Sequence, residues 1–366
     1  MSIEAKSAIK NVAPYKQGQS EIDGVADPIK LSSNELPYPP SPAAVKALVE
    51  APVNIGRYPD GSQKQLRAAI AKQFGIPSEN IFAGNGSEEA LGLIVRSVLA
   101  PGDNIVVSEN SFVMTEIYAR SCGADVVKVG EVDFRVDIDA VLDRVNSGTK
   151  IVYLCSPNNP TGTYLTKSEI ARLNVELPDD VLLLLDAAYA EFVTADDYDC
   201  GIATLFLPAG RVAVTHTFSK AYGLAGQRIG WAAVPNQIAD AVSRLRTPFN
   251  TNAPALAAAT AAIKDQNYLR VTSAKIVETR EWFAEEMRLL GINTVPSQTN
   301  FVLLTFPEGG NEASLLDQEL QRNGILARPV TGTANELRFS IGTQEEMQSA
   351  RDVVASWWAR RKDGDE

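Results

Sequence analysis

Short apolar runs alternate with stretches of helical spacing over the first two thirds of the chain. The runs end at turn or polar residues and comprise Asn104 to Ser108, Lys150 to Cys155, Val181 to Leu185, Val212 to Thr215 and Ile229 to Val234. Their continuous rather than alternating apolarity predicts strands covered on both faces, as in a parallel sheet. Leu91, Ile94, Val95 and Val98 recur at helical spacing behind Ser87, the predicted N-cap of a helix. Strands that alternate with helices predict the α/β class.

The pattern changes after about Ala253. An alanine-rich segment, Ala253 to Ile263, precedes a charged helical pattern from Ala274 to Leu290. Two strand-like segments follow, at 299–305 and 336–341, and Thr343 with the acidic residues after it opens a last helix. We therefore predict three parts: an N-terminal segment 1–30 that packs on the functional site and the small domain, a large domain 31–253, and a smaller α+β domain 254–366.

Composition narrows the function classes. Lys plus Arg number 34 against 45 Asp plus Glu, a net charge of −11, which argues against nucleic acid or a membrane surface as partner. The strongest apolar run is far too short to span a bilayer, and the N-terminus lacks a signal-peptide pattern. Three widely separated cysteines without CxxC spacing favour a reducing compartment, and we expect a cytoplasmic protein. With one histidine, His216, a structural zinc site is not expected.

Lys220 is the first candidate for chemistry. It lies in Thr217-Phe218-Ser219-Lys220, directly after the predicted strand Val212 to Thr215, and Arg228 follows closely. A lysine at the carboxyl end of a parallel strand points into the crevice where α/β sheets bind ligands. Taken alone, a solvated lysine in a polar loop is the simpler interpretation. The residues at two further strand ends favour a functional role for Lys220 instead.

Both of those predicted strands end in polar residues. The turn-forming sequence Ser156-Pro157-Asn158-Asn159-Pro160-Thr161-Gly162 follows the run Lys150 to Cys155. The run Val181 to Leu185 leads into Asp186, with Tyr189 three residues later. A carboxylate that ends a buried strand is costly unless it meets a cation or hydrogen-bond donors. A protonated pyridine nitrogen is such a partner.

Gly84-Asn85-Gly86-Ser87-Glu88 precedes the first predicted helix. A dinucleotide loop of the form G-x-G-x-x-G would need glycine at position 89, where the sequence has Glu89, so a dinucleotide-dependent dehydrogenase is disfavoured. Backbone N–H groups at such a helix start could still hold a phosphate. A non-catalytic binding module gives no reason for a lysine and an aspartate at two successive strand ends.

Together these motifs resemble the fold-type I aminotransferases. Asn159-Pro160-Thr161-Gly162, Asp186 to Tyr189, Ser219-Lys220 and Arg228 occur in that family's order and approximate spacing. Segments 31–35, 57–60, 84–88, 217–226 and 337–343 resemble its histidinol-phosphate aminotransferase branch, and the similarity runs from about Tyr15 to the last helix. The resemblance implies a large domain with a mostly parallel central sheet flanked by helices, a smaller α+β domain, and pyridoxal 5'-phosphate as cofactor.

The resemblance also assigns roles to the cofactor residues. It implies that Lys220 forms the Schiff base with pyridoxal phosphate and moves the substrate proton, while Asp186 holds the proton of the ring nitrogen. Asn159 and Tyr189 would bond the phenolate oxygen of the ring, and Phe112 would stack on its face. The implied phosphate site consists of Gly86, Ser87, Glu88, Thr217, Ser219 and Arg228.

Further implications concern a partner subunit and the substrate. Tyr58 matches a tyrosine that the family donates from the neighbouring subunit, which implies a homodimer with shared active sites. The implied substrate residues are Tyr15, Asn34, Arg328 and Arg338. Arg338 matches the group that grips the acidic end of the substrate, and Arg328 matches a second cation of this branch. A phosphate dianion with three acceptor oxygens can use both.

The expected reaction is a ping-pong transamination in histidine biosynthesis. L-Histidinol phosphate and 2-oxoglutarate would interconvert with imidazole-acetol phosphate and L-glutamate. An aromatic amino-acid aminotransferase shares nearly all of the motifs and remains an alternative, as does a pyridoxal-phosphate-dependent phospho-amino-acid decarboxylase. The chain departs from the usual residues of the branch at Leu36, Thr115, Ala187 and Gln227. Leu36 and Thr115 are expected near the substrate side of the pocket.

Overall fold

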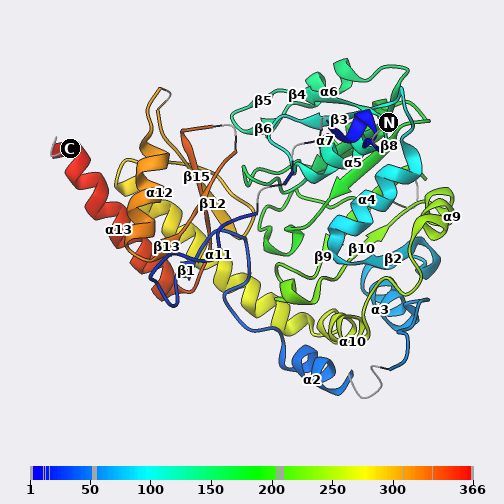
Figure 1. The fold of residues 1–366 in the computed structure, drawn as a ribbon, viewed down its shortest axis with the longest axis horizontal. Helices are drawn as coiled ribbons and strands as arrows, with labels where there is room; N and C mark the ends of the chain where they lie inside the picture. Colours follow the sequence, from blue (N-terminus) through cyan, green and yellow to red (C-terminus); the bar gives the residue numbers. More distant parts are fainter. Residues whose placement is uncertain are drawn as a thin grey trace.

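The computed structural model describes residues 3–10, 12, 14–15, 17–51, 56–202, 206, 210–307, 309–331 and 333–363. Its centre is a seven-stranded sheet in the order β2-β10-β9-β8-β7-β3-β4 (Figure 1). In that order the strands span Ile81–Gly84, Gly230–Ala233, Val212–Thr217, Leu182–Asp186, Thr149–Cys155, Asn104–Ser108 and Asp125–Val129. β10 runs antiparallel to both neighbours, and all other pairs are parallel. The predicted α/β class with a mostly parallel sheet is confirmed.

Helices cover both faces of this sheet, which explains the continuous apolar runs. One face packs against α2 (Pro42–Glu50), α3 (Lys64–Phe74), α6 (Ile138–Arg144), α7 (Lys167–Glu176) and α10 (Ala253–Ala262), and the other against α4 (Gly86–Val98), α5 (Met114–Ser121) and α9 (Asn236–Leu245). Along β7, Val152 and Leu154 face the first layer, whereas Ile151 and Tyr153 face the second. Each fully buried aliphatic side chain contributes about 1.5–3 kcal/mol through removal from water.

Helix α4 is capped two residues earlier than predicted, since the predicted N-cap was Ser87. Its N-cap is Asn85, without a side-chain capping hydrogen bond, and Gly86 is the first helical residue. Gly86 has a φ of 78°, which a residue with a Cβ rarely adopts. The prediction was wrong because apolar spacing identifies the buried face of a helix, whereas a left-handed glycine decides where this helix starts.

A second, smaller unit contains the C-terminal third of the chain, on the left in Figure 1. Its antiparallel sheet has the order β11-β12-β15-β14, with strands Asn293–Val295, Phe301–Thr305, Glu336–Ser340 and Arg328–Pro329. Helices α11 (Gln266–Leu289), α12 (Glu312–Arg322) and α13 (Gln344–Asp363) pack with it. The chain start joins this unit, because β1 (Ile29–Lys30) pairs in parallel with β13 (Ile325–Leu326).

The remaining described elements are short: α1 (Ser7–Lys10), β5 (Glu131–Val132), β6 (Arg135–Val136) and the 3-10 turns η2 (Ser78–Asn80), η3 (Ala190–Phe192) and η5 (Ala225–Gln227). The domain boundaries at residues 30 and 253 stay predictions. Alanines of α10 pack in the core of the central sheet, and Leu31 packs in the core of the smaller unit. Across the described ranges, the chain forms no helix with the length and apolarity needed to cross a membrane.

Candidate active site

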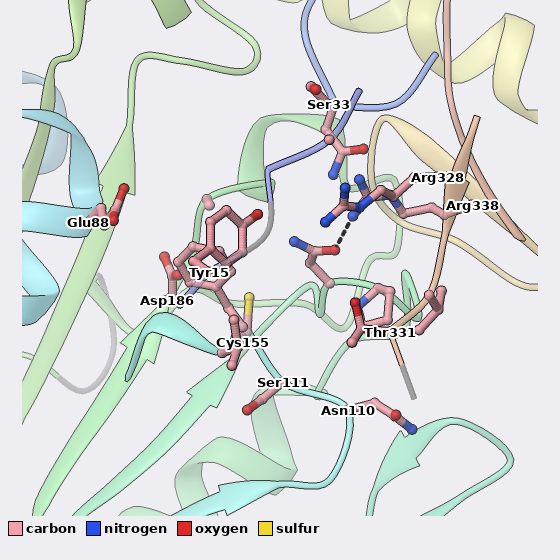
Figure 2. A pocket seen from close by; sticks show the side chains of 18 of the residues that line it. Tyr15, Ser33, Glu88, Asn110, Ser111, Cys155, Asp186, Arg328, Thr331 and Arg338 are labelled. Carbon is pink, nitrogen blue, oxygen red and sulfur yellow. Dashed lines mark hydrogen bonds between the residues drawn. The ribbon is translucent and has the colours of Figure 1, made fainter. Parts of the chain in front are cut away.

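A cavity of about 640 Å³ lies at the carboxyl ends of the parallel strands, between the central sheet and the smaller unit (Figure 2). Its lining contains all but one of the predicted site residues: Tyr15, Asn34, Gly86, Ser87, Glu88, Phe112, Asn159, Asp186, Tyr189, Thr217, Ser219, Lys220, Arg228, Arg328 and Arg338. Strand ends meet at this edge because parallel strands share one direction, and that is where α/β sheets bind ligands. Only Tyr58 is placed elsewhere.

Lys220 follows β9 and turns its amine toward the N-terminal segment. Its Nζ donates a hydrogen bond of 3.0 Å to the carbonyl oxygen of Ser33. Burial lowers the pKa of Lys220 to about 7, and the positive charge of Arg338 acts in the same direction. A lysine with that pKa has a large neutral fraction near neutral pH, which is the form that attacks a carbonyl or accepts a proton.

Asp186 ends β8 and is 4% exposed. One carboxylate oxygen accepts a 2.8 Å hydrogen bond from Thr215, and the other accepts one of 3.3 Å from Tyr153. Burial raises the pKa of Asp186, while the two hydroxyls oppose that rise. The carboxylate therefore lines the cavity in a low-dielectric position where a cationic partner is strongly favoured.

The start of α4 and the loop after β9 form a compact group of donors. Arg228 has a φ of 51°, and its guanidinium donates a 3.3 Å hydrogen bond to the Ser219 hydroxyl. Gly86 has a left-handed backbone, and a Cβ there would lie 2.7 Å from that guanidinium, so a larger residue would be strained and would displace the Arg228 side chain. A Cβ on Gly230 would lie 2.1 Å from the Ser87 nitrogen, which shows how tightly β10 packs on this helix start. Backbone N–H groups, hydroxyls and a guanidinium together suit a phosphate.

Arg328 and Arg338 occupy opposite positions in the β14–β15 pair. Both line the cavity, and Figure 2 shows their guanidinium groups pointing into it. Like charges at directly opposite positions of a strand pair are unfavourable. Burial lowers the pKa of Arg338 to about 10, and Arg328 acts in the same direction. Two guanidinium groups at one end of the cavity make that end suit an anion.

Two amides complete the polar lining. Arg338 donates a hydrogen bond to the side-chain oxygen of Asn159. The Asn34 amide nitrogen donates one of 3.0 Å to the Tyr189 hydroxyl, and Ser340 binds both the backbone nitrogen and the side-chain oxygen of Asn34. These contacts join segments from the start, middle and end of the chain around the cavity.

Sequence reasoning missed Ser33, Thr215 and Tyr153 as contacts of the central groups. Thr215 and Tyr153 lie inside predicted strands, and their apolar neighbours gave no reason to single them out. Leu36, Thr115, Ala187 and Gln227 do not themselves line the cavity, although Leu36 lies two residues from Asn34 and Thr115 lies between Val113 and Glu116, which do. The signal that could have identified Thr215 is its register opposite Asp186, which requires the pairing of β8 and β9.

Tyr58 lies outside the cavity of this chain. Its side chain is 83% exposed and stacks on Phe249, with ring centroids 4.6 Å apart and an interplanar angle of 12°. Single exposed apolar side chains are common on protein surfaces, so the exposure of Tyr58 does not by itself indicate a partner.

Comparison with known proteins agrees with this geometry. A family model described as "Aminotransferase class I and II" matches residues 26–354. The chain is 41% identical over 363 residues to the histidinol-phosphate aminotransferase of Maricaulis maris, covering 98% of this chain and 99% of the relative. It is 42% identical over 346 residues to that of Paramagnetospirillum magneticum, with coverages of 94% and 95%.

A solved structure shows the same fold. The histidinol-phosphate aminotransferase of Sinorhizobium meliloti, in complex with pyridoxal-5'-phosphate, matches with a TM-score of 0.88 at 27% identity and covers 97% of both chains. The chain therefore belongs to the class I and II aminotransferases. Within that class it belongs with the histidinol-phosphate aminotransferases. Enzymes of this family use pyridoxal phosphate, and the buried carboxylate, the lowered pKa of Lys220 and the donor group around Gly86 fit that cofactor.

Proposed function

We propose that this chain transfers the amino group of L-histidinol phosphate to 2-oxoglutarate, giving imidazole-acetol phosphate and L-glutamate in a ping-pong cycle. The identity of the proposed substrate rests on one observation, the opposed pair of Arg328 and Arg338 at one end of the cavity. Histidinol phosphate has a phosphate where an amino acid has its carboxylate. A dianion relieves the repulsion of two guanidinium groups and supplies enough acceptor oxygens for both.

Each group of lining residues would hold one part of the cofactor. The first turn of α4 with Thr217, Ser219 and Arg228 would bind its phosphate. Phe112 would pack on the ring, and Asn159 with Tyr189 would bond its phenolate oxygen. When bound, pyridoxal phosphate supplies a carbonyl that exchanges with the amino group and a ring that accepts electron density from the substrate carbon.

Lys220 and Asp186 would divide the proton chemistry. The neutral Nζ of Lys220 would take the proton from the substrate carbon and return it at a position close by, which its pKa of about 7 allows at neutral pH. The Asp186 carboxylate would accept the hydrogen bond of the ring N–H and keep that proton in place. Thr215 and Tyr153 keep the carboxylate aimed while it does so.

The N-terminal segment and the small unit would orient the substrate. Arg328 and Arg338 would bind its phosphate, Tyr15 would lie over it, and Asn34 would hold the Tyr189 hydroxyl in place. Arg338 is only 8% exposed, and charges in such a low-dielectric position interact more strongly than charges in water. 2-Oxoglutarate would place a carboxylate at the same arginines in the second half-reaction.

The proposed enzyme is a homodimer of the cytoplasm. Tyr58, exposed on this chain, would reach the cofactor phosphate in the neighbouring subunit, and each cavity would then be completed by its partner. The unpaired state of Cys122, Cys155 and Cys200 supports a reducing compartment.

A half-reaction tests the substrate. The holoenzyme is mixed, without 2-oxoglutarate, with L-histidinol phosphate or with L-phenylalanine at equal concentration, and the loss of the visible absorbance of the bound cofactor is followed. Faster conversion by histidinol phosphate is the expected result. Faster conversion by phenylalanine would assign the chain to the aromatic aminotransferases, and carbon dioxide release from a phospho-amino acid would assign it to the decarboxylases.

A further inference from the structure

Arg280 is a buried cation that lies outside the cavity. It belongs to α11 and is 1% exposed. Its Nη1 donates hydrogen bonds to the carbonyl oxygens of Thr299, at 3.0 Å, and Phe192, at 3.3 Å. Its other nitrogens bind one carboxylate oxygen of Glu281. Burying a guanidinium costs free energy unless hydrogen bonds and an ion pair compensate for the lost water, and burial lowers the pKa of Arg280.

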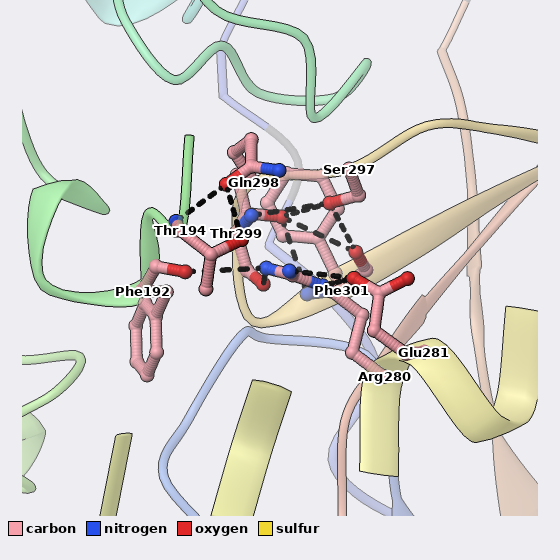
Figure 3. A network of polar contacts seen from close by, with 8 residues as sticks. All are labelled: Phe192, Thr194, Arg280, Glu281, Ser297, Gln298, Thr299 and Phe301. Atoms are coloured by element: carbon pink, nitrogen blue, oxygen red, sulfur yellow. Dashed lines mark hydrogen bonds and ion pairs between the residues drawn. The ribbon is translucent and has the colours of Figure 1, made fainter. Parts of the chain in front are cut away.

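The two carbonyls belong to segments that are far apart in sequence. Phe192 ends the turn η3 after β8, and Thr299 lies in the loop before β12 (Figure 3). The same loop is anchored a second time, because the Thr194 nitrogen donates a 2.7 Å hydrogen bond to the Gln298 side chain. The Gln298 nitrogen donates one of 2.8 Å to the carbonyl of Gly162. Arg280 therefore lies where the small unit meets two loops of the central sheet.

One of those loops leads directly to the cavity. The Phe192 nitrogen donates a 3.0 Å hydrogen bond to the carbonyl of Tyr189. Next to Thr299, the Asn300 side chain donates one of 3.0 Å to the Asn34 carbonyl, and the Asn34 amide in turn binds the Tyr189 hydroxyl. These contacts form a closed path that runs from Arg280 through Phe192, Tyr189, Asn34, Asn300 and Thr299 back to Arg280. The second loop, at Gly162, carries Asn159 three residues earlier.

We propose that Arg280 is a positioning residue that sets the placement of Tyr189, Asn34 and Asn159 by joining the segments that carry them. One guanidinium nitrogen fixes the distance between η3 and the 296–300 loop, and that distance sets where the side chains of Asn34, Asn159 and Tyr189 lie. The inference rests on the proposed function, since it assumes that Tyr189 and Asn159 face the cofactor's phenolate oxygen.

The test compares Arg280→Lys and Arg280→Met with Arg288→Met in the holoenzyme. Arg288 lies on the same helix and pairs with Glu285 at the surface, so it is a matched control. Lysine keeps the charge but cannot present the same planar set of donors. Loss of the hydrogen bonds from Nη1 to the carbonyls of Phe192 and Thr299 should raise KM for the amino substrate about tenfold. Arg288→Met should leave KM unchanged.

A second measurement separates positioning from simple stabilisation. With the cofactor bound, a misplaced Tyr189 would donate a weaker hydrogen bond to the phenolate oxygen, and that oxygen would then favour the protonated form of the bound cofactor. The pH midpoint of the visible absorbance of the bound cofactor should therefore move upward in both Arg280 variants, and stay in place in Arg288→Met. Lower thermal stability with an unchanged midpoint and KM would overturn the proposal.

Gln298→Ala provides a test if Arg280→Met does not fold. It removes the contact to Thr194 but leaves Arg280 in place, and a smaller upward shift of the midpoint is expected. An unchanged midpoint in both Gln298→Ala and Arg280→Lys would contradict the inference. A wild-type enzyme that binds the cofactor but prefers phenylalanine would instead reject the proposed substrate, and the comparison of midpoints would still stand.

Discussion

Asp186 and Thr215 are register partners on the neighbouring strands β8 and β9, and a 2.8 Å hydrogen bond joins their side chains. Tyr153 approaches the other carboxylate oxygen from β7, on the opposite side. The carboxylate is therefore held from both adjacent strands, and its direction is determined by the sheet. This support favours the proposed hydrogen bond from Asp186 to the cofactor's ring nitrogen, because misalignment weakens a buried charge-assisted hydrogen bond.

Asp186→Asn should lower kcat by about a hundredfold or more, since breaking a buried charged pair costs about 3 kcal/mol or more. The amide has nearly the same shape but carries no negative charge for the ring N–H. Steady-state kinetics with saturating cofactor measures the effect, and Asp240→Asn on the exposed face of α9 is the control. A kcat within a few-fold of wild type would remove Asp186 from the proposed mechanism.

The rate at which cofactor-free protein binds pyridoxal phosphate should depend on the Lys220 amine. Because the pKa of Lys220 is about 7, the reactive neutral form increases as pH rises through that value. The association rate, followed by visible absorbance, should rise with pH and level off about one unit above the midpoint. A midpoint near that of an exposed lysine would contradict the proposed environment of Lys220.

Lys220→Ala should lack the visible absorbance of the covalently bound cofactor and should not turn over substrate, whereas Lys72→Ala on α3 should keep both.

Arg328→Met should affect the phosphorylated substrate most. Two charge-assisted hydrogen bonds at about 1.5 kcal/mol each correspond to about a hundredfold loss in kcat/KM for histidinol phosphate. For phenylalanine the loss should be far smaller, because Arg338 alone satisfies a carboxylate. Measurement of kcat/KM for both substrates gives the ratio, with Arg322→Met on α12 as the control. An equal loss for both substrates would argue against a phosphate at Arg328.

Mixed dimers test the shared site. Tyr58→Ala and Lys220→Ala should each impair every site in their own dimers, the first through weaker cofactor binding. In a dimer with one subunit of each kind, one cavity would combine Lys220 from one chain with Tyr58 from the other. Refolding the two variants together should restore tight cofactor binding and turnover to part of the population. No recovery, with dimers present by light scattering, would exclude donation of Tyr58 across the interface.

The sheet and its edge could be predicted from the sequence because their signals are local. Continuous apolar runs such as Val181 to Leu185 identify strands buried on both faces, and the polar residue that ends each run identifies the functional edge. The antiparallel direction of β10 could not be predicted, since its apolar run resembles those of the parallel strands. The N-cap at Asn85 was also missed, because it depends on the left-handed backbone of Gly86.

By itself the sequence determined the fold class, the family and the residue types available at each strand end, because residue order and apolar spacing are properties of the chain alone. Only the tertiary structure decided that Arg328 stands opposite Arg338, that Thr215 and Tyr153 hold Asp186, and that Arg280 joins the loops behind Tyr189. These relationships depend on strand register and on the packing of one unit against the other. Both are set by contacts between residues distant in sequence, which leave no periodic pattern along the chain.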